Sequence, residues 1–239
     1  MDSAGIGDIH CHILPGVDDG PQSVKESLGM ARCLVAGGVK NVFATSHHIA
    51  GTAWAITPEQ VHQEIQQLQA LFVQEGIPLT LHAGMEIAIH PHLLKEVERN
   101  VLLPLGRSDY YLLEPPFHAL GQDLLQIVLS FKNTGKNVIL AHPERIPFFQ
   151  KNIRPLLSLA KQGVMMQINL GSLLGMFGKR AKSFSLQLAE LDIIHFVASD
   201  AHGLTTRTPP AKECWVKLVK LLGAERTTRV CVENPAILY

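Results

Sequence analysis

The stretch Asp8-Ile9-His10-Cys11-His12 closes a predicted strand that begins at Ile6. Side chains two residues apart on a strand point to the same face, so the imidazoles of His10 and His12 can bind one metal ion. Cys11 lies between them and is expected to face the opposite side, in the core. Alone, an H-x-H pair is a common match, and the alternative is two partly exposed histidines near a chain terminus. The polar residues that follow later strands make the metal site the stronger interpretation.

Predicted strands and helices alternate through the whole chain. The strands are expected at residues 6–12, 39–45, 79–83, 110–113, 137–141, 164–169 and 194–198, with helical segments between them. Alternation of this kind predicts a parallel sheet. Seven units in 239 residues favour a closed or nearly closed α/β barrel over two doubly wound halves. No change in composition marks a linker, so residues 1–239 are expected to form a single domain.

Two local patterns between the strands carry further predictions. Ser23 and Glu26 stand three residues apart at the start of the first helical segment, which predicts a capping box. A helix is predicted over residues 119–134. The glycine-rich segment Gly171–Lys179 is interpreted as a loop that could cover the site.

Composition argues against several classes of protein. Hydrophobic residues make up 46% and charged residues 18%, which disfavours disorder. The 21 basic and 21 acidic residues balance, so nothing indicates a surface for nucleic acid or membrane. No apolar run approaches the roughly 20 residues of a membrane span, and no signal peptide is evident. A cytoplasmic protein is expected, with reduced thiols at Cys11, Cys33, Cys214 and Cys231, which lack C-x-x-C spacing.

Side chains that bind metals follow nearly every predicted strand. They are His10, His12, His47, Glu86, Glu114, His142, Asp200 and His202. In a parallel barrel the carboxyl ends of the strands open onto one rim, where active sites are built. Imidazole and carboxylate ligands suit Mn, Fe, Zn or Mg, whereas a thiolate zinc site would need cysteines at the rim. These carboxylates and a loop aspartate carry more charge than one divalent ion needs, so two or three ions are expected.

Two arginines in rim loops predict an anionic substrate. Arg145 lies three residues after His142, and Arg207 lies five residues after His202. The guanidinium group matches phosphate bidentately, and paired metals about 3.5–4 Å apart are the usual device for hydrolysing phosphate esters. The alternative for each is a solvated loop arginine. The sequence contains no C-x5-R loop of the thiol-dependent phosphatases, so a metal-dependent phosphoesterase is favoured.

The motifs resemble those of the PHP (polymerase and histidinol phosphatase) superfamily. More narrowly, they are similar to the bacterial manganese-dependent protein-tyrosine phosphatases of capsular and exopolysaccharide loci. The matching stretches are residues 8–21 (D-I-H-C-H-I-L-P-G-V-D-D-G-P), 45–48 (T-S-H-H), 84–87 (G-M-E-I), 113–114 (L-E), 141–145 (A-H-P-E-R) and 198–202 (A-S-D-A-H). The resemblance covers nearly the whole chain. The resemblance implies a PHP-type (β/α)7 distorted TIM-like barrel.

The resemblance also implies a trinuclear metal centre. One ion would be held by His10, His12, Glu86 and Asp200. Glu86 would bridge to a second ion, completed by Glu114 and His142. The third would be held by Asp18, His47 and His202, with Asp19 in place of Asp18 and His48 in place of His47 left open. Manganese is the metal implied, with Fe, Zn and Mg as alternatives, and Arg145 and Arg207 would be the catalytic residues that hold the phosphate.

The activity implied is that of a protein-tyrosine phosphatase (EC 3.1.3.48). Its substrate would be the tyrosine-rich tail of an autophosphorylating bacterial tyrosine kinase that regulates capsule or exopolysaccharide synthesis. Glu114 favours this branch, because histidinol phosphatases tend to carry histidine there; Pro143 departs from the pattern without chemical consequence. The alternatives are a phosphoesterase acting on histidinol phosphate, another small phosphomonoester or nucleic acid, and a non-catalytic metal-binding domain that docks on a kinase. The last predicts fewer ligands at the rim.

Overall fold

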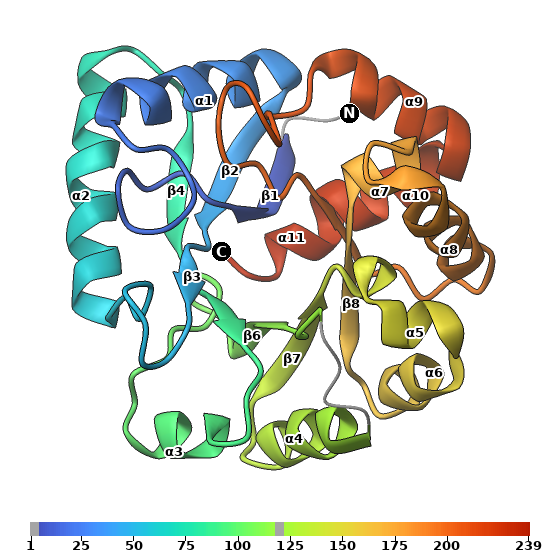
Figure 1. Cartoon of the computed structure of the whole chain (residues 1–239). Helices are drawn as coiled ribbons and strands as arrows, with labels where there is room; N and C mark the ends of the chain where they lie inside the picture. Colours follow the sequence, from blue (N-terminus) through green and yellow to red (C-terminus); the bar gives the residue numbers. More distant parts are fainter. Residues whose placement is uncertain (1–4, 118–121) are drawn as a thin grey trace.

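The computed structural model is a ring of parallel strands surrounded by helices (Figure 1). It describes residues 5–117 and 122–239. The strands are β1 (Ile6–Cys11), β2 (Val39–Ala44), β3 (His47–His48), β4 (Thr80–Ala83), β5 (Glu86–Ala88), β6 (Tyr110–Glu114), β7 (Asn137–Ala141), β8 (Met165–Asn169) and β9 (Phe196–Ala198). Every ladder between these strands is parallel. The predicted α/β fold is confirmed.

Two short breaks divide the ring into two sheets, ordered β1-β2-β4 and β3-β5-β6-β7-β8-β9. Residues 45–46 separate β2 from β3, and residues 84–85 separate β4 from β5, so each pair continues one strand of the ring. The ring closes between β1 and the segment after β9, where Cys11 and Ala201 form a parallel bridge. The Asp200 N–H donates to His10 O at 2.8 Å across this closure. The carboxyl end of β1 is thereby fixed beside residues 200–201.

Helices cover the outside of the ring. They are α1 (Val24–Gly37), α2 (Pro58–Gln74), α3 (Leu93–Glu98), α4 (Gln122–Lys132), α5 (Pro147–Lys151), α6 (Arg154–Lys161), α7 (Leu170–Leu174), α8 (Gly178–Glu190), α9 (Lys212–Leu222), α10 (Ala224–Thr228) and α11 (Asn234–Ala236), with a 3₁₀ turn η1 (Pro143–Arg145) and a π-helical segment η2 (Arg229–Glu233). None of the helices in the described ranges is both long and apolar enough to cross a membrane.

Three predicted local features differ from the structure or extend beyond the described residues. Ser23 caps α1, but the Glu26 carboxylate accepts from Gln22 N–H rather than from Ser23, so only half of the capping box forms. The segment Gly171–Lys179 is not a loop, because it contains most of α7 and the start of α8. The helix predicted over 119–134 is present as α4, and residues 119–121 lie outside the described part of the chain.

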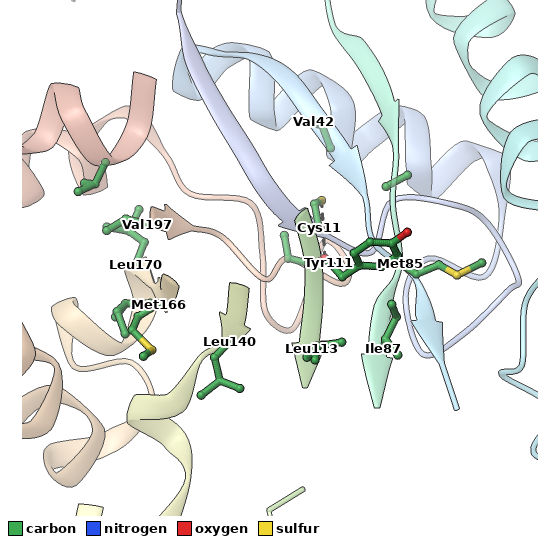
Figure 2. Packing of buried hydrophobic residues seen from close by; sticks show 14 of the residues in the cluster. Cys11, Val42, Met85, Ile87, Tyr111, Leu113, Leu140, Met166, Leu170 and Val197 are labelled. Atoms are coloured by element: carbon green, nitrogen blue, oxygen red, sulfur yellow. Dashed lines mark hydrogen bonds between the residues drawn. The ribbon is translucent and has the colours of Figure 1, made fainter. Parts of the chain in front are cut away.

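Buried side chains form two layers on opposite faces of the strands. The outer layer packs between strands and helices, and Figure 2 shows Cys11 there with Val42 and Leu113. The expectation that Cys11 faces the core is confirmed. The layer inside the ring, which we call the interior cluster, consists of Ile9, Phe43, Leu105, Leu112, Ile139, Ala141, Phe196, Ala198 and Leu238. The C-terminal segment after α11 thus contributes to the inside of the ring (Figure 1).

A bulge in β1 interrupts the regular alternation of side chains between the two faces of the strand. Asp8 pairs with Val42 and Cys11 with Ala44, so β1 contains one extra residue in this interval. As a result Ile9 belongs to the interior cluster while the next residue, His10, faces the carboxylate of Glu86. Bulges commonly redirect side chains near functional sites in this way.

Candidate metal centre

The predicted rim residues converge on the carboxylate of Glu86, at the carboxyl end of the barrel. Glu86 begins β5 and is fully buried. Its two oxygens lie within 3.0–3.2 Å of ring nitrogens from His10, His12, His47 and His142. These four histidines come from three different parts of the ring, which places residues up to 132 positions apart around one carboxylate (142 − 10). Burial raises the pKa of Glu86, but the surrounding histidines lower it well below its usual range.

The residues of the first predicted ligand set lie together. His10 Nε2 is 3.1 Å from Glu86 Oε1 and 3.4 Å from Asp200 Oδ1. His12 Nε2 is 3.2 Å from Glu86 Oε2 and 3.7 Å from the same Asp200 oxygen. Two imidazole nitrogens and two carboxylates therefore face one point, and none of these side chains is exposed.

The residues of the second set lie on the other side of Glu86. His142 Nε2 is 3.0 Å from Glu86 Oε1 and 3.6 Å from Glu114 Oε1. The second oxygen of Glu114 is 3.6 Å from His47 Nδ1, so His47 also borders this set. Burial, followed by the nearby Glu86 carboxylate, raises the pKa of Glu114 to about 7. A divalent cation between these carboxylates would relieve that repulsion.

Asp19, rather than Asp18, faces the third set. Asp19 Oδ1 is 3.3 Å from His202 Nε2 and 3.5 Å from His47 Nε2, and His12 completes the group. Asp18 instead accepts hydrogen bonds from His12 Nδ1 at 2.7 Å and from the His47 N–H at 2.9 Å. It belongs to none of the groups of possible metal ligands among the described residues. The geometry therefore favours Asp19 over the sequence prediction of Asp18.

His48 points away from this centre. Its Nδ1 donates to Ile56 O at 2.8 Å, and its Nε2 lies 3.4 Å from Glu96. The ring of His47, in contrast, stacks on Trp54 with an interplanar angle of 9°. The structure favours His47 over His48 as the residue that serves the centre.

Hydrogen bonds to Nδ1 fix which nitrogen of three histidines faces the centre. His10 Nδ1 donates to Gln167 Oε1 at 2.9 Å, His12 Nδ1 to Asp18 Oδ2, and His202 Nδ1 to Asp200 O at 3.0 Å. Because each of these oxygens only accepts, Nδ1 is held as a donor, and Nε2 is the nitrogen that faces the carboxylates and would be free to bind a metal. Histidines that bind metals are typically oriented by such partners. The donor set and its orientation fit divalent cations.

Both predicted arginines contact Asp200. Arg145 donates from Nη1 to Asp200 Oδ2 at 3.0 Å, and Arg207 donates from Nη2 to Oδ1 at 2.6 Å. Asn169 also donates to Oδ2, at 2.7 Å. Burial raises the pKa of Asp200, but His10, His142 and Arg207 lower it far below the usual range. The two guanidinium groups therefore lie at the edge of the candidate metal centre.

Backbone strain is concentrated in the same place. His142, Asp200 and Arg207 have φ angles of 30°, 55° and 47°, in the left-handed region that non-glycine residues rarely adopt. Such conformations cost free energy and persist where the surrounding structure holds them, commonly at functional sites. Here they turn the ligand and arginine side chains inward just after β7 and β9.

The sequence prediction missed a group of supporting residues. Gln167 and Asn169 lie on the inward face of β8, where they orient His10 and Asp200. Glu144 is fully buried and accepts from Ser172 Oγ at 2.6 Å and from Asn169 N–H at 3.2 Å. Burial raises the pKa of Glu144 to about 7 despite these hydrogen bonds. Polar residues alternating within an otherwise apolar strand were the signal for Gln167 and Asn169.

The comparisons with known proteins agree with this geometry. The model of the family described as capsular polysaccharide synthesis, CpsB/CapC, matches residues 6–239. The chain belongs to this family. It is 38% identical over 218 residues to the tyrosine-protein phosphatase YwqE of Bacillus subtilis, covering 91% of this chain and 85% of YwqE. It is 28% identical over 237 residues to the tyrosine-protein phosphatase CpsB of Streptococcus pneumoniae, covering 95% and 96%.

A solved structure supports the same relationship. It comes from crystal structures of YwqE from Bacillus subtilis and CpsB from Streptococcus pneumoniae, described as unique metal-dependent tyrosine phosphatases. It superposes on this CpsB/CapC chain with a TM-score of 0.84 and 37% identity, covering 97% of this chain and 90% of the other. The resemblance drawn from the motifs and the barrel fold that it implied are both confirmed.

Proposed function

We propose that this CpsB/CapC chain, acting as one domain over residues 1–239, is a metal-dependent protein-tyrosine phosphatase. One observation carries the proposal: four histidines surround the Glu86 carboxylate beside two arginines that share Asp200. This combination supplies sites for cations and for an anionic group within one buried rim. The relatives YwqE and CpsB are named tyrosine-protein phosphatases, which supports the same activity for this chain.

The proposed metal ligands form three overlapping sets. They are His10, His12, Glu86 and Asp200; Glu86, Glu114 and His142; and Asp19, His47 and His202, with His12 beside the last set. Manganese is our choice of metal because the motifs resemble those of manganese-dependent phosphatases, and imidazole and carboxylate ligands are compatible with it. Bound divalent ions at such a site lower the pKa of water and neutralise charge on the phosphoryl oxygens. Asp18, Gln167 and Asn169 would keep the ligands oriented.

The two arginines have donors left for a phosphate. Arg145 uses Nη1 and Arg207 uses Nη2 for Asp200, and Arg207 Nε is buried without a hydrogen-bond partner among the described residues. We propose that the remaining N–H groups bind two non-bridging oxygens and stabilise the charge that develops on them. The leaving group of phosphotyrosine is a phenolate with a pKa of about 10, so a separate general acid is not required.

The physiological substrate that we propose is the tyrosine-rich tail of an autophosphorylating bacterial kinase. The family description, capsular polysaccharide synthesis, supports a role in controlling capsule or exopolysaccharide production. We also propose a cytoplasmic location, where such a tail would lie. The four cysteines are free thiols in the structure, which is consistent with a reducing compartment.

The test is hydrolysis of a phosphotyrosine peptide by purified protein that has been stripped with a chelator and reloaded with Mn, Mg, Zn or Fe. We expect no turnover without metal and the highest turnover with Mn. Histidinol phosphate and single-stranded DNA, assayed in parallel, should be poorer substrates. Preferential hydrolysis of histidinol phosphate would favour the small-molecule alternative, and metal binding without hydrolysis of any substrate would refute an enzymatic role.

A further inference from the structure

A groove leads away from Arg145 between α5 and α8. Its inner part is a cavity of about 320 Å³ lined by Phe117, Arg145, Phe177 and Arg180. An adjoining cavity of about 410 Å³ shares Arg180 and extends the groove to Lys151. Each volume is within the range of small-ligand sites, roughly 300–1,000 Å³. We call these two cavities together the α5–α8 groove.

The inner end of the groove is continuous with the candidate metal centre. The Arg145 guanidinium lies 5.1 Å from the Phe117 ring centroid and 4.4 Å from that of Phe177, while its Nη1 donates to Asp200. Phe117 also stacks on the ligand candidate His142, with ring centroids 5.9 Å apart. Because 39% of Phe117 is exposed, its ring offers an aromatic surface beside Arg145. A phenyl ring attached to a phosphate on Arg145 would contact this surface.

The chain around Phe177 has the residues needed to hold its ring there. Gly175 and Gly178, with φ angles of 90° and 89°, form the tight link between α7 and α8. A Cβ atom on Gly171 would come within 2.7 Å of Phe177 Cε2, so only glycine leaves space for the ring. Three glycines therefore place one aromatic side chain against Arg145, which explains the glycine-rich composition of this segment.

The outer part of the groove carries positive charges that are not neutralised by acidic residues among its described lining. Arg180 and Lys151 are both exposed, and neither has an ion-pair partner in the part of the chain that the structure describes. The described residues that line the two cavities include no aspartate or glutamate. Lys179 and Arg180 also fall in the first turn of α8, where the helix dipole disfavours cations and no acidic residue offsets them. Helix stability does not account for these charges.

We propose that the α5–α8 groove binds the polypeptide that flanks the phosphotyrosine and selects an anionic side chain there. The phosphotyrosine ring would lie at Phe117, with the phosphate on Arg145, and the flanking anion would pair with Arg180 and Lys151. A carboxylate or a second phosphotyrosine would serve equally, since both offer oxygens to these cations. This inference rests on the proposed phosphatase function and identifies its substrate class as acidic phosphopeptides.

The experiment compares peptides that contain one phosphotyrosine in a neutral sequence with peptides that carry glutamate or a second phosphotyrosine on its N-terminal or C-terminal side. The readout is the ratio of kcat/KM for an acidic peptide to kcat/KM for the neutral peptide. We expect the Mn-loaded protein to prefer at least one acidic peptide by about fivefold. The double variant Arg180→Glu with Lys151→Glu should lower that ratio to about one or below.

A matched variant controls for net charge. Lys161→Glu with Lys217→Glu changes the charge equally at exposed positions outside the groove and should keep the ratio of the unmodified protein. Binding of fluorescent peptides that contain a non-hydrolysable difluorophosphonate in place of phosphate should show the same preference. The unmodified protein and the control variant should bind the acidic peptide more tightly than the neutral one, and the groove variant should not. Equal ratios in the two double variants, or no preference in the unmodified protein, would overturn the inference. Free phosphotyrosine, assayed alongside, separates this outcome from failure of the proposed function, in which no phosphotyrosine substrate is hydrolysed.

Discussion

The inward faces of β6 and β9 carry two kinds of side chain in succession. On β6, Leu112 belongs to the interior cluster, and Glu114, two residues later on the same face, belongs to the candidate metal centre. After Phe196 and Ala198 on β9, the chain reaches Asp200. One layer is apolar and the next is charged, although both are nearly or fully buried.

The two layers have opposite energetic consequences. Burial of the interior cluster stabilises the fold through the removal of apolar surface from water. Burial of the carboxylates and imidazoles above it is costly unless each group is paired or binds a metal. The interior cluster therefore stabilises the fold, whereas the carboxylates and imidazoles above it serve the proposed reaction. Substitutions in the interior cluster should mainly lower stability, and substitutions among the carboxylates and imidazoles should mainly lower activity.

The largest expected effect is on activity, from Glu86→Gln. This change keeps the size of the side chain but removes the charge that four histidines face. We expect kcat/KM for a phosphotyrosine peptide to fall by about 10³-fold or more, because the carboxylate that we propose as a metal ligand is lost. Metal content after dialysis, measured by elemental analysis, should fall in parallel. Activity within tenfold of the unmodified protein would show that Glu86 is not a ligand.

The next effect is on stability, from Phe196→Ala in the interior cluster. Phe196 is fully buried, and its truncation should lower the free energy of unfolding by about 3–5 kcal/mol. Urea unfolding monitored by circular dichroism measures this change. Turnover per folded molecule, assayed at low temperature with Mn, should stay within a few fold. A large loss of turnover without a loss of stability would contradict the separation of the two layers.

The carboxylates and imidazoles of the candidate metal centre, which we call the charged layer, could be predicted from the sequence more completely than the backbone features and hydrogen-bond partners that orient them. Strand ends and residue types sufficed for His10, Glu86 and His142, because parallel strands bring their carboxyl ends together. The bulge in β1 could not be predicted, since it appears only when Asp8 and Cys11 are paired with their partners on β2. Neither could the choice between Asp18 and Asp19, because two neighbouring aspartates in a glycine-rich turn differ only in the direction of their side chains.

Substitutions of Asp18 and Asp19 should have an intermediate effect, on the affinity for metal. Asp19→Asn replaces the carboxylate that faces His47 and His202 with a neutral amide and should lower the affinity for the third ion directly. Asp18→Asn removes the negative charge that faces His12 Nδ1 and should weaken metal binding by roughly 10–100-fold. Metal titrations under competition with a chelator measure both. If only Asp18→Asn reduced the number of ions bound per protein, the original sequence prediction would be correct.

The last expected effect, which needs no substitution, is a change in bound protons when metal binds among the carboxylates and imidazoles. Burial lowers the pKa values of His10 and His12, but the adjacent carboxylates outweigh it and raise them to about 9 and about 10 in the metal-free protein. Because these values exceed the ordinary 6.5, the stabilisation from protonation is complete below about pH 6.5 and is lost as pH rises through 9 to 10.

Metal binding shows the opposite dependence on pH, because a metal ion takes the nitrogens that protons occupy at pH 7.5. The apparent metal affinity should therefore increase from pH 6.5 to 9, by up to roughly tenfold per pH unit for each proton displaced. Calorimetric titrations with Mn in buffers of different ionisation enthalpy count the protons released. Asp18→Asn, which removes a carboxylate that raises the pKa of His12, should reduce that count. A binding enthalpy that is independent of the buffer would mean that these histidines are already neutral, and that the charged layer is balanced without protons.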